Sequence, residues 1–526
     1  MAQRIESIDV SIEELEQLVD RAGREPLPPE GQRKLKAAVG TLGLMAEMLA
    51  DKETTIQKLR ELLLPARSSE KTDKVCNDKG KEPKPKGERK KRRKKGHGRN
   101  GAADYASAPK VSVTHPTLGC GDHCPECKKG KLYPLQEPRN LIRIIGQAPV
   151  QATVYQLQAL RCNLCGEVFT APPPAGVGAE KYDVTAVSMI ALFKYGSGIP
   201  FYRMQRLESQ FGIPLAAATQ WELMLTAAAI LQPIWEEFIR QAAQGCLVHN
   251  DDTSMRILSF HREASDSRTG LFTSGIVSVL GQYRIAVFLT GRKHAGENLA
   301  DVLRRRGAEL SPPIQMCDAL SRNAPESLQV ILANCLAHGR RYFVGVANSF
   351  PTECRYVLET LREVFHFDAL AREQGLSPEE RLSFHQQRSL PLMEGLEAWC
   401  RQQLEDGKVE PNSGLGKAIQ YLQNHWQKLT LFLRVPGAPL DNNLCERALK
   451  KAILHRKNAL FYRTTTGASV GDLFMSLIHT AELCGANAFD YLTELLRHAS
   501  DLAKAPSRWM PWNYRENLNK VPSLAA

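Results

Sequence analysis

The central part of the chain carries four short apolar stretches of the kind that form β-strands, at residues 245–252, 275–282, 283–291 and 312–319. A segment with helical spacing, residues 295–306, separates the last two. Strands combined with a helix in this way predict an α/β unit. Two of these strands end in a carboxylate, Asp251 (or Asp252) on the first and Asp318 on the last. A lone Asp at a strand end is usually a turn residue or a cap, so this pattern alone assigns no chemistry.

Helical periodicity dominates three other regions. Residues 176–244 predict two helices with a break at Gly212, which is compatible with a helix-turn-helix, although a plain helical bundle is the simpler alternative. Residues 328–425 are mostly helical and charged, and they predict a helical insertion after Asp318. Residues 467–497 predict a terminal helical segment, and we expect the tail beyond Trp509 to be loosely packed.

The N-terminal 65 residues carry a heptad pattern. Leu35, Leu42, Leu49, Ile56 and Leu63 fall at every seventh position in a segment rich in charged residues and alanine. Such spacing predicts a helical, zipper-like region that could serve self-association. An amphipathic helix packed on its own domain is an equally good interpretation.

Residues 66–110 form a segment without hydrophobic periodicity, and they hold much of the net charge of +12. We predict a disordered linker that contacts DNA phosphates, with a solvated spacer as the alternative. The residues expected to contact DNA are Arg89, Lys90, Lys91, Arg92, Arg93, Lys94, Lys95 and Arg99.

Length and composition limit the class of protein. A chain of 526 residues is too long for a single core, so several domains are expected. The polar start has no secretory signal, and no apolar run approaches the roughly 20 residues that a membrane span needs. We therefore expect a cytoplasmic protein with no membrane partner.

Two Cys-x-x-Cys motifs stand out among thirteen cysteines, Cys124 to Cys127 and Cys162 to Cys165. Each pair places two thiolates on one turn, and two pairs complete a tetrahedral zinc site. Strand-like residues 141–147 and 152–160 lie between them, so we predict a zinc β-ribbon over residues 111–175. Four thiolates leave no open position on the metal, which favours one structural Zn²⁺; Cys120 and His123 are alternative ligands.

Residues 440–458 predict an amphipathic helix with Glu446 in its first turn. A row of basic residues follows, comprising Lys450, Lys451, His455, Arg456 and Lys457. Taken alone, this pattern predicts a surface helix with a Glu446–Lys450 ion pair that stabilises the helix by roughly a few tenths of a kcal/mol.

The two strand-end aspartates suggest a different role for Glu446, as a third metal ligand. Three carboxylates on one sheet-and-helix platform can hold two divalent cations about 3.5–4 Å apart for in-line attack on phosphate. Carboxylate oxygens suit Mg²⁺, or Mn²⁺ in its place. An RNase H-like nuclease fold would supply Asp251, Asp318 and Glu446 in this way, and Lys450, Arg456 and Lys457 would then contact the DNA backbone.

The chain resembles the transposases of the insertion sequence 66 family, which are DDE enzymes, over nearly its whole length. The motifs that carry the resemblance are GHGR at 96–99, CPEC at 124–127, CNLC at 162–165, DDT at 251–253, CDA at 317–319, CLAHGRRYF at 335–343, LDNNLCERALK at 440–450, HRKNALF at 455–461 and SLIHTAELCGANAFDYL at 476–492. The resemblance implies that Asp251, Asp318 and Glu446 form the DDE triad. It also implies a homo-oligomer that binds DNA ends and target DNA, in some members together with small companion proteins.

The sequence departs from the family pattern at two neighbours of the triad. The family usually has Asp-Glu-Thr-Pro at the first carboxylate, where this chain has Asp251-Asp252-Thr253-Ser254, and it commonly has Tyr after the second Asp, where this chain has Ala319. Cys335 and His338 resemble a C-x-x-H pair of several DDE enzymes, with a packing role as the alternative.

These observations predict a multidomain α+β protein. Its expected parts are the zipper-like region 1–65, the linker 66–110, the zinc ribbon 111–175, the helical region 176–244, an RNase H-like catalytic core at 245–462 with its insertion at about 328–425, and a C-terminal helical domain at 463–526. The expected function is DNA transposition: binding of terminal inverted repeats, metal-dependent 3′-end cleavage and strand transfer. The alternatives are a catalytically inactive DNA-binding protein derived from a transposase and a zinc-ribbon nuclease without strand transfer.

Overall fold

The computed structural model describes residues 110, 112–133, 147–161, 163, 165, 167–178, 180–260, 268, 270–325 and 328–518, together with Gly31. The heptad leucines, the basic residues 89–99 and Cys162 lie outside the described residues. The chain divides into two compact units. We call residues 79–332 with 443–526 the sheet unit, and residues 1–78 with 333–442 the helical unit.

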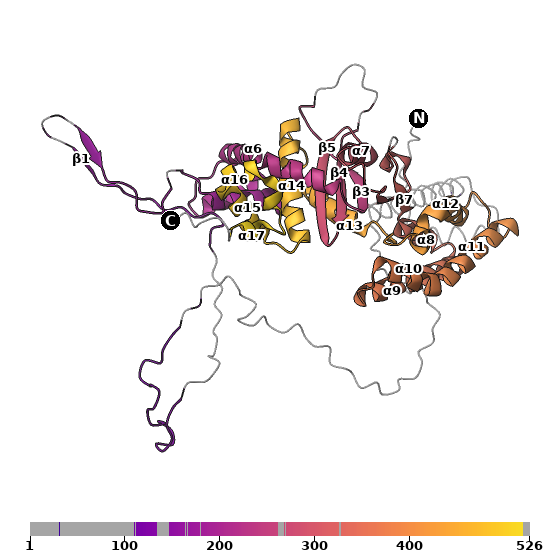
Figure 1. Ribbon diagram of the computed structural model, residues 1–526, viewed down its shortest axis with the longest axis horizontal. Coiled ribbons are helices and arrows are strands. Elements are labelled where there is room, and N and C mark those ends of the chain that lie inside the picture. The colour runs from indigo at the N-terminus through magenta and orange to yellow at the C-terminus, as the bar shows by residue number, and fades with distance from the viewer. Residues whose placement is uncertain are drawn as a thin grey trace. The chain divides into compact units, whose positions relative to one another are not determined.

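A five-stranded mixed sheet organises the sheet unit, with the strand order β5-β4-β3-β6-β7. Figure 1 shows β5, β4 and β3 side by side in this sheet. The strands are β3 (Leu247–Ser254), β4 (Phe272–Leu280), β5 (Tyr283–Gly291), β6 (Ile314–Cys317) and β7 (Ile331–Asn334); the first two residues of β7 belong to the sheet unit and the last two to the helical unit. The first three form an antiparallel meander, and β6 runs parallel to β3. The four predicted strands are thus confirmed with slightly shifted ends. The fifth, β7, was missed because a four-residue apolar run cannot be distinguished from buried helix by periodicity.

Helices cover both faces of this sheet. On one face α7 (Ala295–Leu303) packs on β3 and β4, where Asn298 Nδ2 donates to Ser274 Oγ at 2.8 Å. On the opposite face α13 (Asn443–Ala459) packs on the same two strands, with Cys445 Sγ 3.2 Å from Gly275 O. Successive strand residues point to opposite faces, so Ser274 and Gly275 mark the two sides.

The remaining helices of the sheet unit surround this centre and share its apolar core. They are α4 (Val184–Ala191), the π-helical turn η2 (Leu192–Gly196), α5 (Phe201–Gln210), α6 (Ala217–Ala242), α14 (Thr465–Leu483), α15 (Ala488–Arg497), α16 (Ala499–Lys504), η5 (Pro506–Trp509) and α17 (Tyr514–Leu518), with the short η3 (Ser321–Asn323) after β6. The predicted break at Gly212 is present, and its φ of +77° suits glycine. Buried Gln220 donates to Phe201 O and Leu215 O and so joins α5 to α6.

The outer edge of β5 has no neighbouring strand among the described residues, and side chains of α14 accept hydrogen bonds from its backbone amides. Thr480 Oγ1 accepts a hydrogen bond from Ala286 N at 3.0 Å, Ser476 Oγ from Phe288 N at 3.0 Å, and Asp472 Oδ2 from Thr290 N at 2.6 Å. Positions four apart on a helix advance about 6 Å, and positions two apart on a strand advance about 6.6 Å, so the two rows match. The helix therefore satisfies a strand edge that would otherwise bury unpaired amides.

We expect Ser476→Ala to lower the free energy of unfolding by about 1–3 kcal/mol, because it leaves the buried Phe288 amide without its acceptor. Chemical denaturation of the full chain measures this loss, and hydrogen exchange should locate it at Phe288. Ser469→Ala is the matched control on the same helix, since Ser469 is exposed, and its effect should stay within about 0.5 kcal/mol. Equal stability of the two variants would contradict this role for Ser476.

The helical unit is built from α8 (Leu336–Val346), α9 (Pro351–Glu373), α10 (Pro378–Arg388), α11 (Leu390–Glu405), α12 (Gly414–Leu429) and the short η4 (Leu431–Leu433). The predicted insertion at 328–425 is therefore helical as expected, except that β7 occupies its beginning and α12 continues past its end. The charged carboxylate of Asp368 is buried at the contact of α9 and α10. None of the helices in the described part of the chain is both long and apolar enough to span a membrane.

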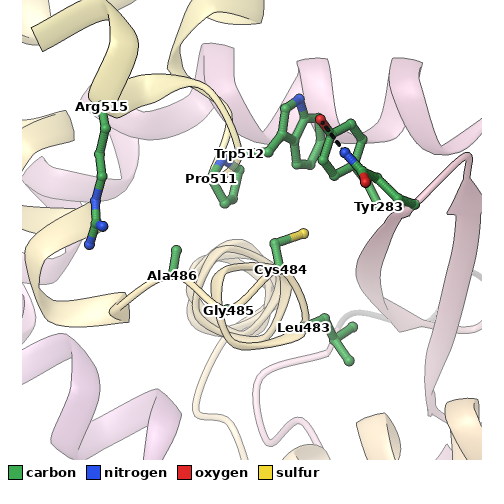
Figure 2. Close-up of a pocket in the computed structure, with 9 residues that line it drawn as sticks. Tyr283, Leu483, Cys484, Gly485, Ala486, Pro511, Trp512 and Arg515 are labelled. Atoms are coloured by element: carbon green, nitrogen blue, oxygen red, sulfur yellow. Dashed lines mark hydrogen bonds between the residues drawn. The ribbon is translucent and has the colours of Figure 1, made fainter. Parts of the chain in front are cut away.

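The segment after Trp509 packs more tightly than the sequence predicted. Trp509, Met510 and Tyr514 are buried, and the Tyr491 hydroxyl donates to Trp509 O at 2.7 Å. Trp512 stacks on Tyr283, and both line a pocket with Pro511 and Arg515 (Figure 2). The expectation of a loose tail was thus wrong up to Leu518, because isolated aromatic residues gave no periodic signal while their large apolar areas favour burial.

Candidate active site

The three candidate carboxylates come from three elements of the sheet unit. Asp251 is on β3, Asp318 directly follows β6, and Glu446 is in the first turn of α13. Because β3 and β6 are adjacent and parallel, their carboxyl ends reach the same edge of the sheet. α13 packs across β3 and β4 and brings Glu446 to that edge.

The structure separates the roles of Asp251 and Asp252. Asp252 is held by two basic side chains: His294 Nδ1 lies 2.9 Å from its Oδ2, and Arg322 Nη2 lies 3.4 Å from its Oδ1. Its register partner Ser274 faces α7. Asp251 pairs in register with Gly275, which faces α13. Asp251 is therefore the residue on the side of Glu446.

Asn323 connects the two aspartates. Its Nδ2 donates to Asp318 Oδ1 at 2.5 Å and lies 3.4 Å from Asp251 Oδ1. The main-chain oxygen of Asn323 accepts hydrogen bonds from Asn250 Nδ2 at 2.7 Å and from Gln315 Nε2 at 2.6 Å. The buried side-chain amides of these two residues, on β3 and β6, therefore hold Asn323 in place. The sequence offered no sign of this residue beyond its position shortly after Asp318.

The charges of Asp318 and Glu446 affect the ionisation of Asp251. Burial raises the pKa of Asp251, the negative charges of Asp318, Asp252 and Glu446 raise it further, and the result is about 7. A carboxylate that is costly to ionise among like charges is stabilised by a cation. The donor set is made of carboxylate oxygens, which suit hard divalent ions such as Mg²⁺. The residues present therefore fit the expected metal.

The basic residues of α13 divide into exposed and engaged groups. Lys450 and Lys457 are exposed, as expected for DNA contacts. Arg456 Nη1 instead donates to Thr253 Oγ1 at 2.9 Å and to Ser254 Oγ at 2.7 Å, which ties the helix to the end of β3. Lys451 pairs with Glu482 of α14.

His455 does not belong to the cationic row that the sequence suggested. It is buried and stacks on Tyr462 at 4.3 Å between ring centroids. Burial, with a smaller contribution from the charge of Lys194, lowers the pKa of His455 to about 3. The imidazole is therefore neutral at physiological pH and forms part of the packing under α13.

The predicted zinc ribbon is described only in part. Cys124 and Cys127 lie on a turn closed by Cys124 N donating to Gly130 O at 2.8 Å, and a bridge pairs His123 with Lys131. Hydrogen bonds from the Gly130 and Lys129 amides, followed by one from Cys124, lower the pKa of the Cys127 thiol.

Cys165 of the second Cys-x-x-Cys motif lies between β1 (Ala159–Arg161) and β2 (Val168–Thr170), two short strands that pair antiparallel. The strand expected at 152–160 is therefore confined to its last residues. Residues 141–146 lie outside the described part of the chain. Among the residues that are described, the ligand atoms of Cys124, Cys127 and Cys165 do not come together within 4.8 Å.

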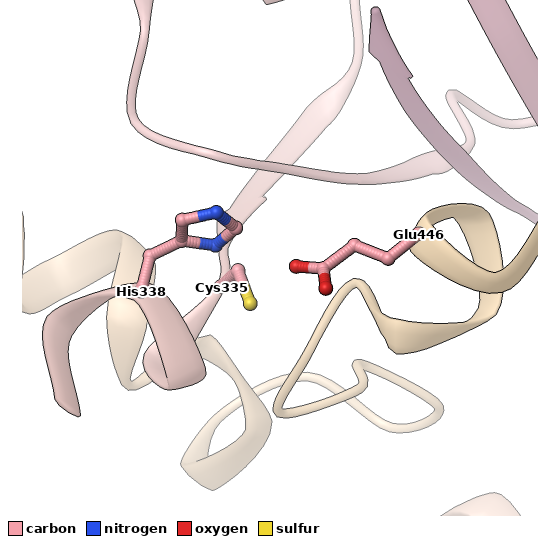
Figure 3. A group of neighbouring side chains, drawn as sticks. All are labelled: Cys335, His338 and Glu446. Carbon is pink, nitrogen blue, oxygen red and sulfur yellow. The ribbon is translucent and has the colours of Figure 1, made fainter. Parts of the chain in front are cut away.

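Cys335 and His338 belong to the helical unit. Cys335 is the N-cap residue of α8, and its Sγ accepts a hydrogen bond from Asn442 N at 3.2 Å. His338 follows in the first turn of the same helix, with its ring beside the Cys335 thiol (Figure 3). Figure 3 also shows Glu446, whose carboxylate extends from the start of α13 in the sheet unit.

Comparison with known proteins decides the family. A family model described as "Transposase IS66 family" matches residues 181–470, which is more than half of the chain and includes all three carboxylates. The chain belongs to this transposase family. Members of the family act on DNA, so the chain is assigned to the DNA-processing proteins.

Similar proteins come from Sinorhizobium fredii (strain NBRC 101917 / NGR234). "Uncharacterized protein y4jD" is 27% identical over 375 residues, which cover 67% of this chain and 71% of that protein. "Uncharacterized protein y4hP" is 24% identical over 447 residues, which cover 80% of this chain and 78% of the relative. No solved structure matches the chain.

Proposed function

We propose that the protein is a DDE transposase that binds the inverted repeats of its element, cleaves the 3′ ends and transfers them to target DNA. The observation that carries this proposal is the meeting of Asp251, Asp318 and Glu446 at one edge of the sheet, where each carboxylate affects the ionisation of Asp251. The sheet also supports an RNase H-like core, since a three-stranded antiparallel meander is extended by a parallel strand beside its first member.

Asp251, Asp318 and Glu446 would hold the divalent ions. Two such ions supply Lewis-acid chemistry: they activate the attacking water or hydroxyl and stabilise charge on the leaving oxygen. The protein's own contribution is position. Asn323 keeps the two aspartates at a set separation, and Arg456 anchors α13, and so Glu446, to the end of β3.

DNA would lie across this edge of the sheet. Exposed Lys450 and Lys457 follow Glu446 on the same helix and suit contacts with the phosphate backbone. The basic run at 89–99 would add affinity without sequence information. The predicted zinc ribbon would contribute to recognition of the repeats, and the α5–α6 pair is a further candidate for this role.

A strand-transfer assay with the element's own ends tests the proposal. Labelled repeat DNA incubated with the protein and Mg²⁺ should yield nicked 3′ ends and then joined products, and EDTA should abolish both. Binding without cleavage would identify a catalytically inactive DNA-binding protein. Nicks without joined products would identify a nuclease that lacks strand transfer.

A further inference from the structure

Gly275 lies at the contact between the candidate active site and the helix that carries Glu446. It is the direct register partner of Asp251 across β3 and β4. Its carbonyl oxygen lies 3.2 Å from Cys445 Sγ, and Cys445 immediately precedes Glu446. One backbone position therefore pairs with one of the three carboxylate residues and contacts the chain neighbour of a second.

The space beside Gly275 is filled by α13. A Cβ added at this position would lie 3.0 Å from Leu449 Cγ and Cδ2 and 3.4 Å from Cys445 Sγ. Leu449 and Cys445 are buried, so these atoms have little room to move aside. A methyl group here would displace α13 from the sheet by a few tenths of an ångström or more.

Backbone conformation does not explain this glycine. Gly275 is outside the group of described glycines with positive φ, and it continues a regular antiparallel ladder. Glycine inside a strand weakens the strand, because it has no side chain to pack. Alanine at position 275 would thus suit the strand itself, and only the close approach of α13 opposes it.

We propose that Gly275 is a positioning residue that sets the depth of α13 on the sheet and thereby the separation of Glu446 from Asp251. This inference rests on the proposed function, in which these two carboxylates bind the same metal ions. Supporting residues around metal ligands typically change metal affinity by about 10–100-fold when they are altered. A displacement of about 1 Å near reacting groups can cost roughly 100-fold in rate.

The test uses the full-length protein and Mn²⁺ as the metal probe. We expect Gly275→Ala to weaken Mn²⁺ binding about tenfold by titration and to reduce cleavage at limiting Mg²⁺ by at least about tenfold. Repeat-DNA affinity should be unchanged, and excess metal should restore much of the activity. A purely structural role would not produce this metal dependence.

Two further variants separate geometry from stability. Gly275→Ala combined with Leu449→Ala removes the two leucine atoms that lie 3.0 Å from the new methyl group and should restore Mn²⁺ binding toward the wild-type value. Gly245→Ala is the control for lost stability, since its added Cβ would overlap Ser278 Oγ and lie 2.8 Å from Val279 O of β4, and its three nearest atoms include none of α13. It should leave Mn²⁺ affinity unchanged even where it lowers stability.

The proposal is overturned by wild-type Mn²⁺ affinity in Gly275→Ala, or by equal losses in Gly275→Ala and Gly245→Ala. These outcomes are distinct from failure of the proposed function. Absence of cleavage by the wild-type protein would contradict the proposed transposase activity. The Mn²⁺ titrations would still show whether Gly275 positions the carboxylates.

Discussion

Glu446→Gln is expected to abolish cleavage and joining of repeat DNA while leaving DNA binding intact. The substitution keeps the size of the side chain but removes one negative charge from the group that surrounds Asp251. Metal ions stabilise charge at the reacting phosphate by several kcal/mol, and a loss of about 4 kcal/mol corresponds to a rate decrease of roughly 1,000-fold. Asp318→Asn should have the same effect.

The measurement is a cleavage time course with end-labelled repeat DNA, together with a mobility-shift assay for binding. Asp301→Asn is the matched control, because Asp301 is a partly exposed carboxylate of the same unit that lies on α7, at the opposite face of the sheet, and pairs with Lys293 and Arg304. Its activity should equal that of the wild type. Full activity of Glu446→Gln, or equal loss in Asp301→Asn, would contradict the assignment of the triad.

Much of this site could be predicted from the sequence because it depends on local patterns. The strands that carry Asp251 and precede Asp318, and the helix that carries Glu446, each follow a clear apolar period. Local patterns could not show which of the two aspartates on β3, Asp251 or Asp252, lies beside Glu446. The answer depends on which sheet face α13 covers, and that is a property of packing.

The supporting residues escaped prediction for the same reason. Asn323 acquires its role because β3 and β6 are adjacent, and Gly275 because β4 passes under α13. His455 shows the converse error. Its place among lysines and arginines suggested an exposed cation, yet helical spacing places it on the buried face beside Tyr462. Composition predicts charge, whereas burial decides whether a histidine carries it.

The helical unit contains a buried carboxylate, Asp368, with several basic partners. Asp368 Oδ1 accepts from Arg381 Nε at 2.9 Å and Nη2 at 2.6 Å, and His385 Nε2 lies 3.3 Å away. Arg372 pairs with the other oxygen. Burial acts to raise the pKa of Asp368, but the hydrogen bond from His385 and the charges of Arg381 and Arg372 outweigh it and lower the pKa to about 2.

We expect Asp368→Asn to destabilise the helical unit by about 3–5 kcal/mol at pH 7, because Arg381 is then largely buried without its counter-charge. The pKa in the folded protein lies below the unfolded value of about 4, so the wild-type carboxylate stabilises the fold above pH 4. That contribution, about 2 kcal/mol, is lost as the pH falls from 4 towards 2. The difference in the free energy of unfolding between wild type and Asp368→Asn should therefore become smaller as the pH falls below 4.

Chemical denaturation of the full chain between pH 7 and pH 2 measures this difference in the free energy of unfolding, and hydrogen exchange should place the loss in α9 and α10, which supply Asp368, Arg381 and His385. Glu363→Gln on α9 is the matched control, since Glu363 is about half exposed and its pair with Arg362 is at the surface. Its effect should stay within about 0.5 kcal/mol at every pH. A constant difference between wild type and Asp368→Asn across this range would show that the Asp368 charge does not stabilise the contact of α9 with α10.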